Sequence, residues 1–241
     1  MISIPAHFTA EFLFPSSCPL CGARVSTDGE LCADCWVGFN WIGNPKCSVC
    51  GYPFPANLDL GTHPICPHCY QMPSRLKWIR CACVYDDVSR SAMLPFKHGG
   101  RIQYARFMSR AIMWAMRDIP EYPDLVMPVP LAWRRLFHRG YNQATLLARP
   151  IARALGVRMD LTSVRRRYRP DMGHKTASQR SENIRGVFSV VSPDKIHGRS
   201  ILLIDDVMTT GATLNELARV LKRAGARAVY GATFCRVVHA I

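Results

Sequence analysis

The chain has 241 residues, and 49% of them are hydrophobic, which is enough for one sizeable core and a small additional domain. Its formal net charge of +14 lies entirely in residues 81–241, which have 26 Lys or Arg against 12 Asp or Glu, whereas residues 1–80 have five of each. A positive charge of this size favours an anionic partner, but it does not distinguish a phosphorylated substrate from pyrophosphate or nucleic acid. No stretch approaches the roughly 20 apolar residues of a membrane span, and no basic residue precedes the first apolar run, so we expect no export signal and a cytoplasmic location.

Eight of the eleven cysteines form four Cys-x-x-Cys pairs in the first 80 residues. The pairs are Cys18 with Cys21, Cys32 with Cys35, Cys47 with Cys50, and Cys66 with Cys69. In a cytoplasmic protein this spacing favours metal binding over disulfides, and eight thiolates suit two structural zinc ions. Joining the pairs sequentially gives two zinc ribbons, which we favour, and joining first with third gives an interleaved site. His63 and His68 are alternative ligands that four cysteines make unnecessary.

The rest of residues 1–80 offers little for a core, because six prolines interrupt the segment between positions 45 and 73. We therefore predict a metal-dependent domain over 1–80, where zinc contributes on the order of 10–16 kcal/mol, and an α/β domain over 81–241. Trp36, Phe39 and Trp41 could either stack on nucleic-acid bases or pack against the second domain.

The α/β domain begins with an expected strand over 79–85, in which Cys81 and Cys83 are core thiols. Lys97 follows in an expected Gly-containing turn, which either binds phosphate or is an ordinary solvent-exposed turn. A helix is predicted over about 104–116 and a strand over 124–129. The next helix closes on Gly156, and Pro150 should bend it or shift its start.

Arginines gather after the 124–129 strand. Arg134, Arg135, Arg139 and Gly140 lie beyond its carboxyl end, the edge at which open α/β sheets bind ligands. Arginine offers bidentate, charge-assisted contacts to pyrophosphate. Farther along, residues 165–199 contain nine Lys or Arg against three Asp or Glu. Such a segment predicts a lid that closes over a polyanion, or else a disordered basic loop.

The chain is organised around residues 201–214, where a short apolar run reads as a buried parallel strand over 201–204. Asp205 and Asp206 come at its carboxyl end, where we expect them to be solvated. Thr209, Thr210, Gly211, Ala212 and Thr213 follow, and then Leu214 begins a helical pattern. Amide groups at a helix N-terminus bind phosphate, and adjacent carboxylates suit the hydroxyls of a ribose. The order of these groups predicts a site for a phosphorylated ribose.

This stretch resembles the signature of type I phosphoribosyltransferases, and the whole chain resembles the ComF family. The second resemblance rests on the cysteine pairs, Phe96-Lys97, Arg139-Gly-Tyr-Asn-Gln143 and Arg180-x-x-Asn183-x-x-Gly186-x-Phe188. It implies a type I phosphoribosyltransferase fold, an open and mainly parallel sheet flanked by helices, with a small N-terminal zinc-ribbon domain. Arg169-Pro-Asp-Met172 departs from the Thr-Pro-x-Gln-like stretch that is common in the lid of this family.

The resemblance also implies a chemistry. Phosphoribosyl pyrophosphate would bind with Mg²⁺, with Asp205, Asp206 and Arg139 as catalytic residues and Lys97, Arg134, Arg135, Gly140, Arg180 and residues 209–213 as substrate contacts. Purine-salvage enzymes carry a third acid where this chain has Thr209, so the resemblance disfavours hypoxanthine or guanine as the substrate. The acceptor of the phosphoribosyl group stays open, because acceptor contacts in this fold come from regions without a readable motif. The competing hypothesis is a protein of DNA uptake in natural transformation, which binds single-stranded DNA or the competence machinery without catalysis.

Overall fold

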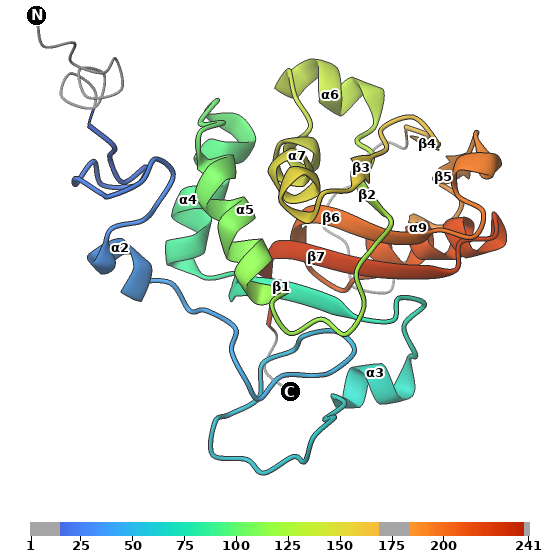
Figure 1. Cartoon of the computed structure of the whole chain (residues 1–241), viewed down its shortest axis with the longest axis horizontal. Helices are drawn as coiled ribbons and strands as arrows, with labels where there is room; N and C mark the ends of the chain where they lie inside the picture. The colour runs from blue at the N-terminus through green and yellow to red at the C-terminus, as the bar shows by residue number, and fades with distance from the viewer. Residues whose placement is uncertain (1–14, 169–183, 239–241) are drawn as a thin grey trace, which may run out of the picture.

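The computed structural model describes residues 15–168 and 184–238. Its centre is a five-stranded parallel sheet in the order β1-β7-β6-β2-β3 (Figure 1). A short antiparallel hairpin, β4 with β5, lies beside it. The strands are β1 Ile79–Val84, β2 Leu125–Pro128, β3 Arg158–Met159, β4 Val164–Arg166, β5 Phe188–Val190, β6 Ser200–Met208 and β7 Ala228–Arg236. Crossovers between parallel neighbours confirm the expected α/β class.

Helices cover both faces of this sheet. Residues of α4, α5 and α7 pack on one face together with Leu202 and Ile204, whereas residues of α9 pack on the other with Ile201 and Leu203. Because successive side chains of β6 enter different cores, its sequence is apolar without alternation. The helices are α2 Ala33–Val37, α3 Pro67–Gln71, α4 Asp87–His98, α5 Tyr104–Ala115, α6 Trp133–Arg139, α7 Gln143–Leu155 and α9 Ala212–Arg223, with a 3₁₀ turn over Pro193–Lys195.

Three details differ from the expectations for these elements. Lys97, which was expected in a Gly-containing turn, lies in the last turn of helix α4. Strand β6 does not stop before the two aspartates: it continues to Met208, because Asp205, Val207 and Met208 pair with residues of the long strand β7. Helix α7 begins at Gln143 and contains Pro150, so the proline does not shift its start. The expected helix over 104–116 and the end of α7 at Gly156 are confirmed.

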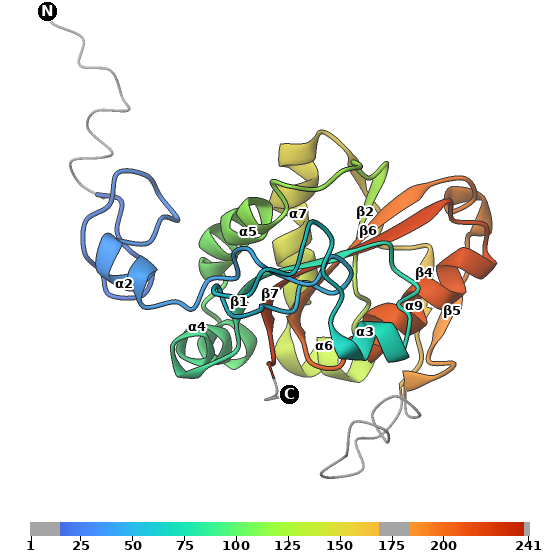
Figure 2. The ribbon, with the colours of Figure 1, turned by 90° about the horizontal axis from the view of Figure 1, so that it is seen from below.

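The N-terminal segment has two parts that contact different sides of the α/β unit. The first part, with α2, contacts α5 through ion pairs of Asp28 with Arg106 and of Glu30 with Arg110. The second part, with α3, lies along β1, where the amide of Ile79 donates to the carbonyl of Val49 at 2.7 Å. In Figures 1 and 2, α2 and α3 are well separated. The two ribbons therefore have different neighbours.

The aromatic residues between the two parts join them to the core. Trp36 stacks on Trp41 at 4.3 Å between ring centroids, and both contact the edge of Trp114 in α5. Phe39 is 4% exposed and packs against Phe107 and Phe234. The structure thus supports packing, and not base stacking, for these three rings. Among the described helices, none is long and apolar enough to cross a membrane.

Candidate functional site

The carboxyl half of β6 carries Asp205 and Asp206 at the edge where β2 and β6 end. One oxygen of Asp206 lies 3.2 Å from the ammonium nitrogen of Lys97, and the side chain of Asp206 is only 13% exposed. Burial, together with the charge of Asp206, raises the pKa of Asp205 to about 7. The expectation of two solvated carboxylates is therefore wrong, since both side chains are partly buried and one is ion-paired.

Lys97 reaches Asp206 because the segment after α6 holds the end of α4. The hydroxyl of Tyr141 donates to the carbonyl of Phe96 at 2.6 Å, and the side-chain amide of Gln143 donates to the carbonyl of Lys97 at 3.2 Å. Arg139 in turn donates to the side-chain oxygen of Gln143 at 3.3 Å. The Arg139–Gln143 motif therefore positions Lys97 beside the carboxylates, a role that its sequence alone did not reveal.

Two other residues of the motif shape the backbone. Gly140 ends α6 with a φ of 75°, a left-handed conformation that favours glycine. The side chain of Asn142 caps α7 by accepting from the amide of Ala144 and donates to the carbonyl of Val129, directly after β2. The motif thus joins three elements, α4, β2 and α7, at one edge of the sheet.

The loop after β6 leads into α9 as the sequence predicts. Gly211 is buried, has a φ of 75° and precedes the first residue of the helix, Ala212. The hydroxyl of Thr210 accepts from the amide of Ala212 at 3.4 Å, while Thr209 is exposed. Thr213 lies in the first turn of α9, whose free amide groups provide a place for an anion, with a dipole contribution of roughly 0.3–1 kcal/mol.

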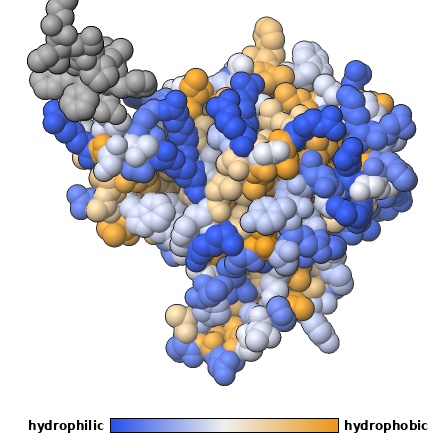
Figure 3. All heavy atoms as spheres, viewed as in Figure 1, coloured by the Kyte–Doolittle hydropathy of each residue, from blue (hydrophilic) through white to orange (hydrophobic). Residues whose placement is uncertain are grey.

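Arg134, also in α6, faces a different neighbour from Arg139. The guanidinium of Arg134 lies 5.3 Å from the ring of Trp133 and 4.7 Å from the ring of Tyr168, which directly follows the β4 segment. Arg135 is partly buried. The surface on the right of Figure 3, where Figure 1 has the β4–β5 hairpin, is mainly hydrophilic. Arg180 and the stretch 169–172 lie outside the described residues.

The sequence reasoning gave neither Arg166 nor Glu216 a specific contact. Arg166 in β4 lies close enough to lower the pKa of Asp205, against the larger effects of burial and of Asp206. Glu216 in α9 accepts from the amide of Gly186 at 2.7 Å and pairs with Arg219. Only the basic composition of residues 165–199 could have indicated Arg166, because its contact depends on the hairpin.

Asp205 makes stability depend on pH. Its pKa of about 7 in the folded state exceeds the ordinary value of 3.8, so the folded chain holds this proton more tightly than the unfolded chain. The resulting stability is complete below about pH 4 and is lost as the pH rises through about 7. Asp205→Asn should therefore raise the free energy of unfolding at pH 8, by roughly 1–3 kcal/mol, and much less at pH 5.

Urea denaturation of both proteins at the two pH values measures this difference. Asp194→Asn is the matched control, because Asp194 is exposed in the 3₁₀ turn. An equal effect of Asp205→Asn at pH 5 and pH 8 would contradict the assignment of the titration to Asp205.

The eight cysteines of the pairs form two quartets, one of Cys18, Cys21, Cys32 and Cys35 and one of Cys47, Cys50, Cys66 and Cys69. The sulfur atoms of each quartet lie within 4.8 Å of one another, as four thiolates on one zinc ion require. Backbone amides of Cys50 and Cys66 point to the sulfur of Cys47 at 3.5 and 3.3 Å. The favoured sequential pairing is confirmed, and His63 and His68 belong to neither quartet.

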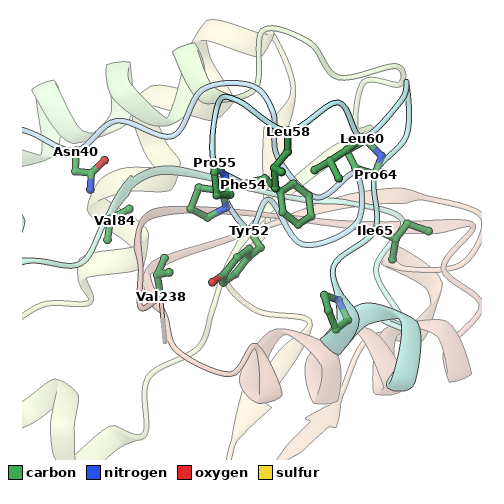
Figure 4. Close-up of a pocket in the computed structure, with 12 residues that line it drawn as sticks. Asn40, Tyr52, Phe54, Pro55, Leu58, Leu60, Pro64, Ile65, Val84 and Val238 are labelled. Carbon is green, nitrogen blue, oxygen red and sulfur yellow. The ribbon is translucent and has the colours of Figure 1, made fainter. Parts of the chain in front are cut away.

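A cavity of about 800 Å³ lies between the second ribbon, the end of β1 and Val238 (Figure 4), and neither Asp205 nor Asp206 lines it. Its walls are formed mainly by prolines and by Tyr52, Phe54, Leu58, Leu60 and Ile65. Among the described residues that line it, none is a predicted contact of the phosphorylated ribose. The described residues of its mainly apolar walls include no charged side chain for phosphate chemistry, so we place the functional site at the sheet edge instead.

Comparison with known proteins agrees with both parts of this description. A family model for the double zinc ribbon domain matches residues 9–70, and a model for the phosphoribosyl transferase domain matches residues 142–240. Of the curated relatives, the DNA utilization protein YhgH of Escherichia coli K12 is 31% identical over 92% of this chain and 90% of its own. Competence protein F of Haemophilus influenzae is 28% identical over 80% and 91%. Competence protein ComFC of Bacillus subtilis is 26% identical over 83% and 81%. With its double zinc ribbon, its phosphoribosyltransferase fold and these relatives, the chain belongs to the ComF family.

Proposed function

We propose that the protein binds phosphoribosyl pyrophosphate with Mg²⁺ at the edge formed by β6, α9 and α4, and that it transfers the phosphoribosyl group to an acceptor. The observation that carries this proposal is the arrangement after β6: two carboxylates, one of them paired with Lys97, followed by a Thr-rich loop at the start of a buried helix. One continuous segment therefore carries both the carboxylates that could accept hydrogen bonds from ribose hydroxyls and the loop whose amides could bind a phosphate.

Different residues of the site would bind the 5-phosphate, the ribose and the pyrophosphate of this ligand. Thr209, Thr210, Gly211, Ala212 and Thr213 would hold the 5-phosphate through amide and hydroxyl groups. Asp205 and Asp206 would accept from the two ribose hydroxyls. Lys97, Arg139 and the α6 residues Arg134 and Arg135 would neutralise the pyrophosphate as it leaves, and Arg180 would add to them from the segment 169–183.

The site has the chemistry that Mg²⁺ needs. Two adjacent carboxylates, one with its pKa raised to about 7, form a pocket of negative charge that a divalent cation would stabilise. Mg²⁺, when bound, would supply positive charge that offsets the charge of the pyrophosphate. The protein's own contribution is to orient the ribose on Asp205 and Asp206 and to keep Lys97 at the leaving group.

The experiment that tests this proposal is pyrophosphate release from phosphoribosyl pyrophosphate and Mg²⁺, measured across a panel of nucleobases and amines. Release that depends on one acceptor would identify both the reaction and its substrate. Absence of calorimetric binding of phosphoribosyl pyrophosphate with Mg²⁺ would contradict the proposal altogether, whereas binding without release under any acceptor would restrict it to a sensor.

One observation favours single-stranded DNA as a second ligand. Helix α6 exposes Trp133 and Phe137, at 64% and 89%, beside Arg134 and Arg135, and stacking with basic groups is how proteins hold unpaired bases. The relatives named for DNA utilization and competence support the same alternative.

We expect this binding to be weak, without sequence preference and strongly dependent on salt. Each neutralised phosphate adds about 0.7 to the negative slope of log K against log salt for single strands. Fluorescence anisotropy of a labelled oligonucleotide at 50 and 200 mM salt measures the slope. Affinity that does not change with salt, or tight binding to one sequence, would contradict this expectation.

A further inference from the structure

Asn215 joins the loop after β6 to the linker that follows the second cysteine quartet. Its side-chain oxygen accepts from the amide of Arg75 at 2.8 Å and from the hydroxyl of Ser74 at 3.2 Å. Its side-chain amide donates to the carbonyl of Gly211 at 3.2 Å, and its backbone amide donates to the same carbonyl at 2.9 Å. One partly buried side chain therefore contacts both segments.

The linker is short, so the second quartet determines where it lies. Cys66 and Cys69 hold α3, which ends at Gln71, and Ser74 follows three residues later. The hydroxyl of Ser74 also accepts from the amide of Leu76, which turns the chain toward β1. A metal-bound quartet thus limits the positions that Ser74 and Arg75 can take.

The end of β7 makes a second connection between the same two places. The guanidinium of Arg236 donates to the carbonyl of Cys50 at 2.7 Å and approaches its sulfur at 3.4 Å. The next residue, Val237, donates its amide to the carbonyl of Met208, just before the loop. Arg236 is 6% exposed, and its positive charge offsets the negative charge that four thiolates bring to the quartet.

Between these two connections lies a cavity of about 340 Å³. Thr209, Thr210 and Gly211 line one side of it, and Cys66, Cys69 and Met72 line the other. The loop therefore does not pack directly on the ribbon over this area. Its position depends on the Asn215 contacts at one end and on the β7 contact at the other.

We propose that the second cysteine quartet, when it holds zinc, fixes the loop of residues 209–213 through Ser74 and Asn215, and that both are positioning residues of the phosphoribosyl site. This proposal takes its ligand, phosphoribosyl pyrophosphate, from the proposed function. It assigns to the second ribbon the role of positioning the loop that would bind the phosphate. The first ribbon contacts α5 instead, so the two quartets should differ in their effect on the loop.

Hydrogen exchange of the full-length, zinc-loaded protein tests the proposal without any ligand. Amides of residues 211–215 should exchange about tenfold faster in Asn215→Ala and in Cys69→Ser than in the wild type, because loop opening becomes easier. Cys21→Ser, which makes the same change in the first quartet, should leave this exchange at the wild-type rate. Wild-type rates in Asn215→Ala, or equal acceleration by both cysteine variants, would overturn the proposal.

Two less disruptive variants of Ser74 test the proposal if Cys69→Ser fails to fold. Ser74→Ala removes the hydroxyl and should accelerate exchange of the loop, whereas Ser74→Thr keeps a hydroxyl and should restore most of the protection. Ser91→Ala on α4 is the matched control, because Ser91 is exposed and its hydroxyl donates only to its own helix, at Val88. Equal rates in Ser74→Ala and Ser74→Thr would contradict a role for the hydroxyl.

Calorimetry with phosphoribosyl pyrophosphate and Mg²⁺ adds the functional readout. Asn215→Ala should weaken binding about tenfold while the melting transition of the α/β unit stays in place. If the wild type does not bind this ligand, the proposed function fails, and the exchange rates still decide whether the second quartet controls the loop. If the wild type binds and Asn215→Ala binds equally well, the positioning role fails alone.

Discussion

Asp206→Asn is expected to lower the affinity for phosphoribosyl pyrophosphate by about ten- to a hundredfold. Asparagine keeps one acceptor oxygen, but it adds a donor and removes the charge, so one charge-assisted hydrogen bond worth roughly 1.5–3 kcal/mol is lost. The change also leaves Lys97 without the carboxylate that lies 3.2 Å from its ammonium group. Asp205→Asn should lose a similar amount, and Thr210→Val should weaken binding through the phosphate alone.

Calorimetric titration with Mg²⁺ measures all three variants against the wild type. The side chains of Lys97 and Asp206 are 22% and 13% exposed, so water can reach part of the broken pair and the fold should persist. Asp194→Asn, a change at an exposed residue of the 3₁₀ turn, controls for loss of charge in general. Unchanged affinity in both aspartate variants would place the ligand elsewhere and overturn the proposed site.

Much of the site could be predicted because it lies on one continuous segment. Residues 201–214 contain a strand, two acids, a loop and a helix start in an order that follows from local sequence, and the structure has them in that order. The extent of β6 could not be predicted, since pairing with β7 carries the strand through the acids to Met208. Pairing with β7, which the local sequence does not reveal, helps to bury Asp205, and this burial together with the charge of the neighbouring Asp206 raises the pKa of Asp205.

Contacts between distant segments were not readable from the sequence. Arg139 and Gly140 were expected to meet pyrophosphate, but the sequence did not show that Tyr141 and Gln143 of the same motif contact carbonyls 45 and 46 residues earlier. Asn215 looks like an ordinary helix residue until the linker after the second quartet is placed beside it. Both depend on the order of strands in the sheet, which periodicity does not determine.

For the zinc ribbons, too, local sequence predicts the metal sites but not the contacts with distant segments. Cysteine spacing predicts two four-thiol sites, and the four sulfur atoms of each quartet lie close enough to share one ion. The contact of the second ribbon with the sheet was not expected, because the segment over 1–80 reads as a separate unit. Amides of Ile42 and Val84 nevertheless bond across the boundary, to the carbonyls of Ala82 and Asn40, each at 2.9 Å.

Removal of zinc is expected to unfold both ribbons, because two bound ions each contribute on the order of 10 kcal/mol to small domains of this kind. Metal analysis of the purified protein should first give two equivalents of zinc. One equivalent would mean that one quartet is not a zinc site, and none would contradict the ribbon interpretation of both.

Chelation should then affect the sheet unevenly. Loss of the second ribbon uncovers one edge of β1, whose amides at Ile79 and Val84 donate to Val49 and Asn40. Exchange of these two amides should accelerate strongly. Amides of Leu202 to Ile204 in the central strand β6 should stay protected, since β2 and β7 flank that strand and both its faces are buried.

Hydrogen exchange before and after treatment with a chelator measures both sets of amides in one sample. Equal loss of protection in β1 and β6 would mean that zinc holds the whole α/β unit together, and unchanged protection at Ile79 and Val84 would mean that the ribbon folds on β1 without its metal.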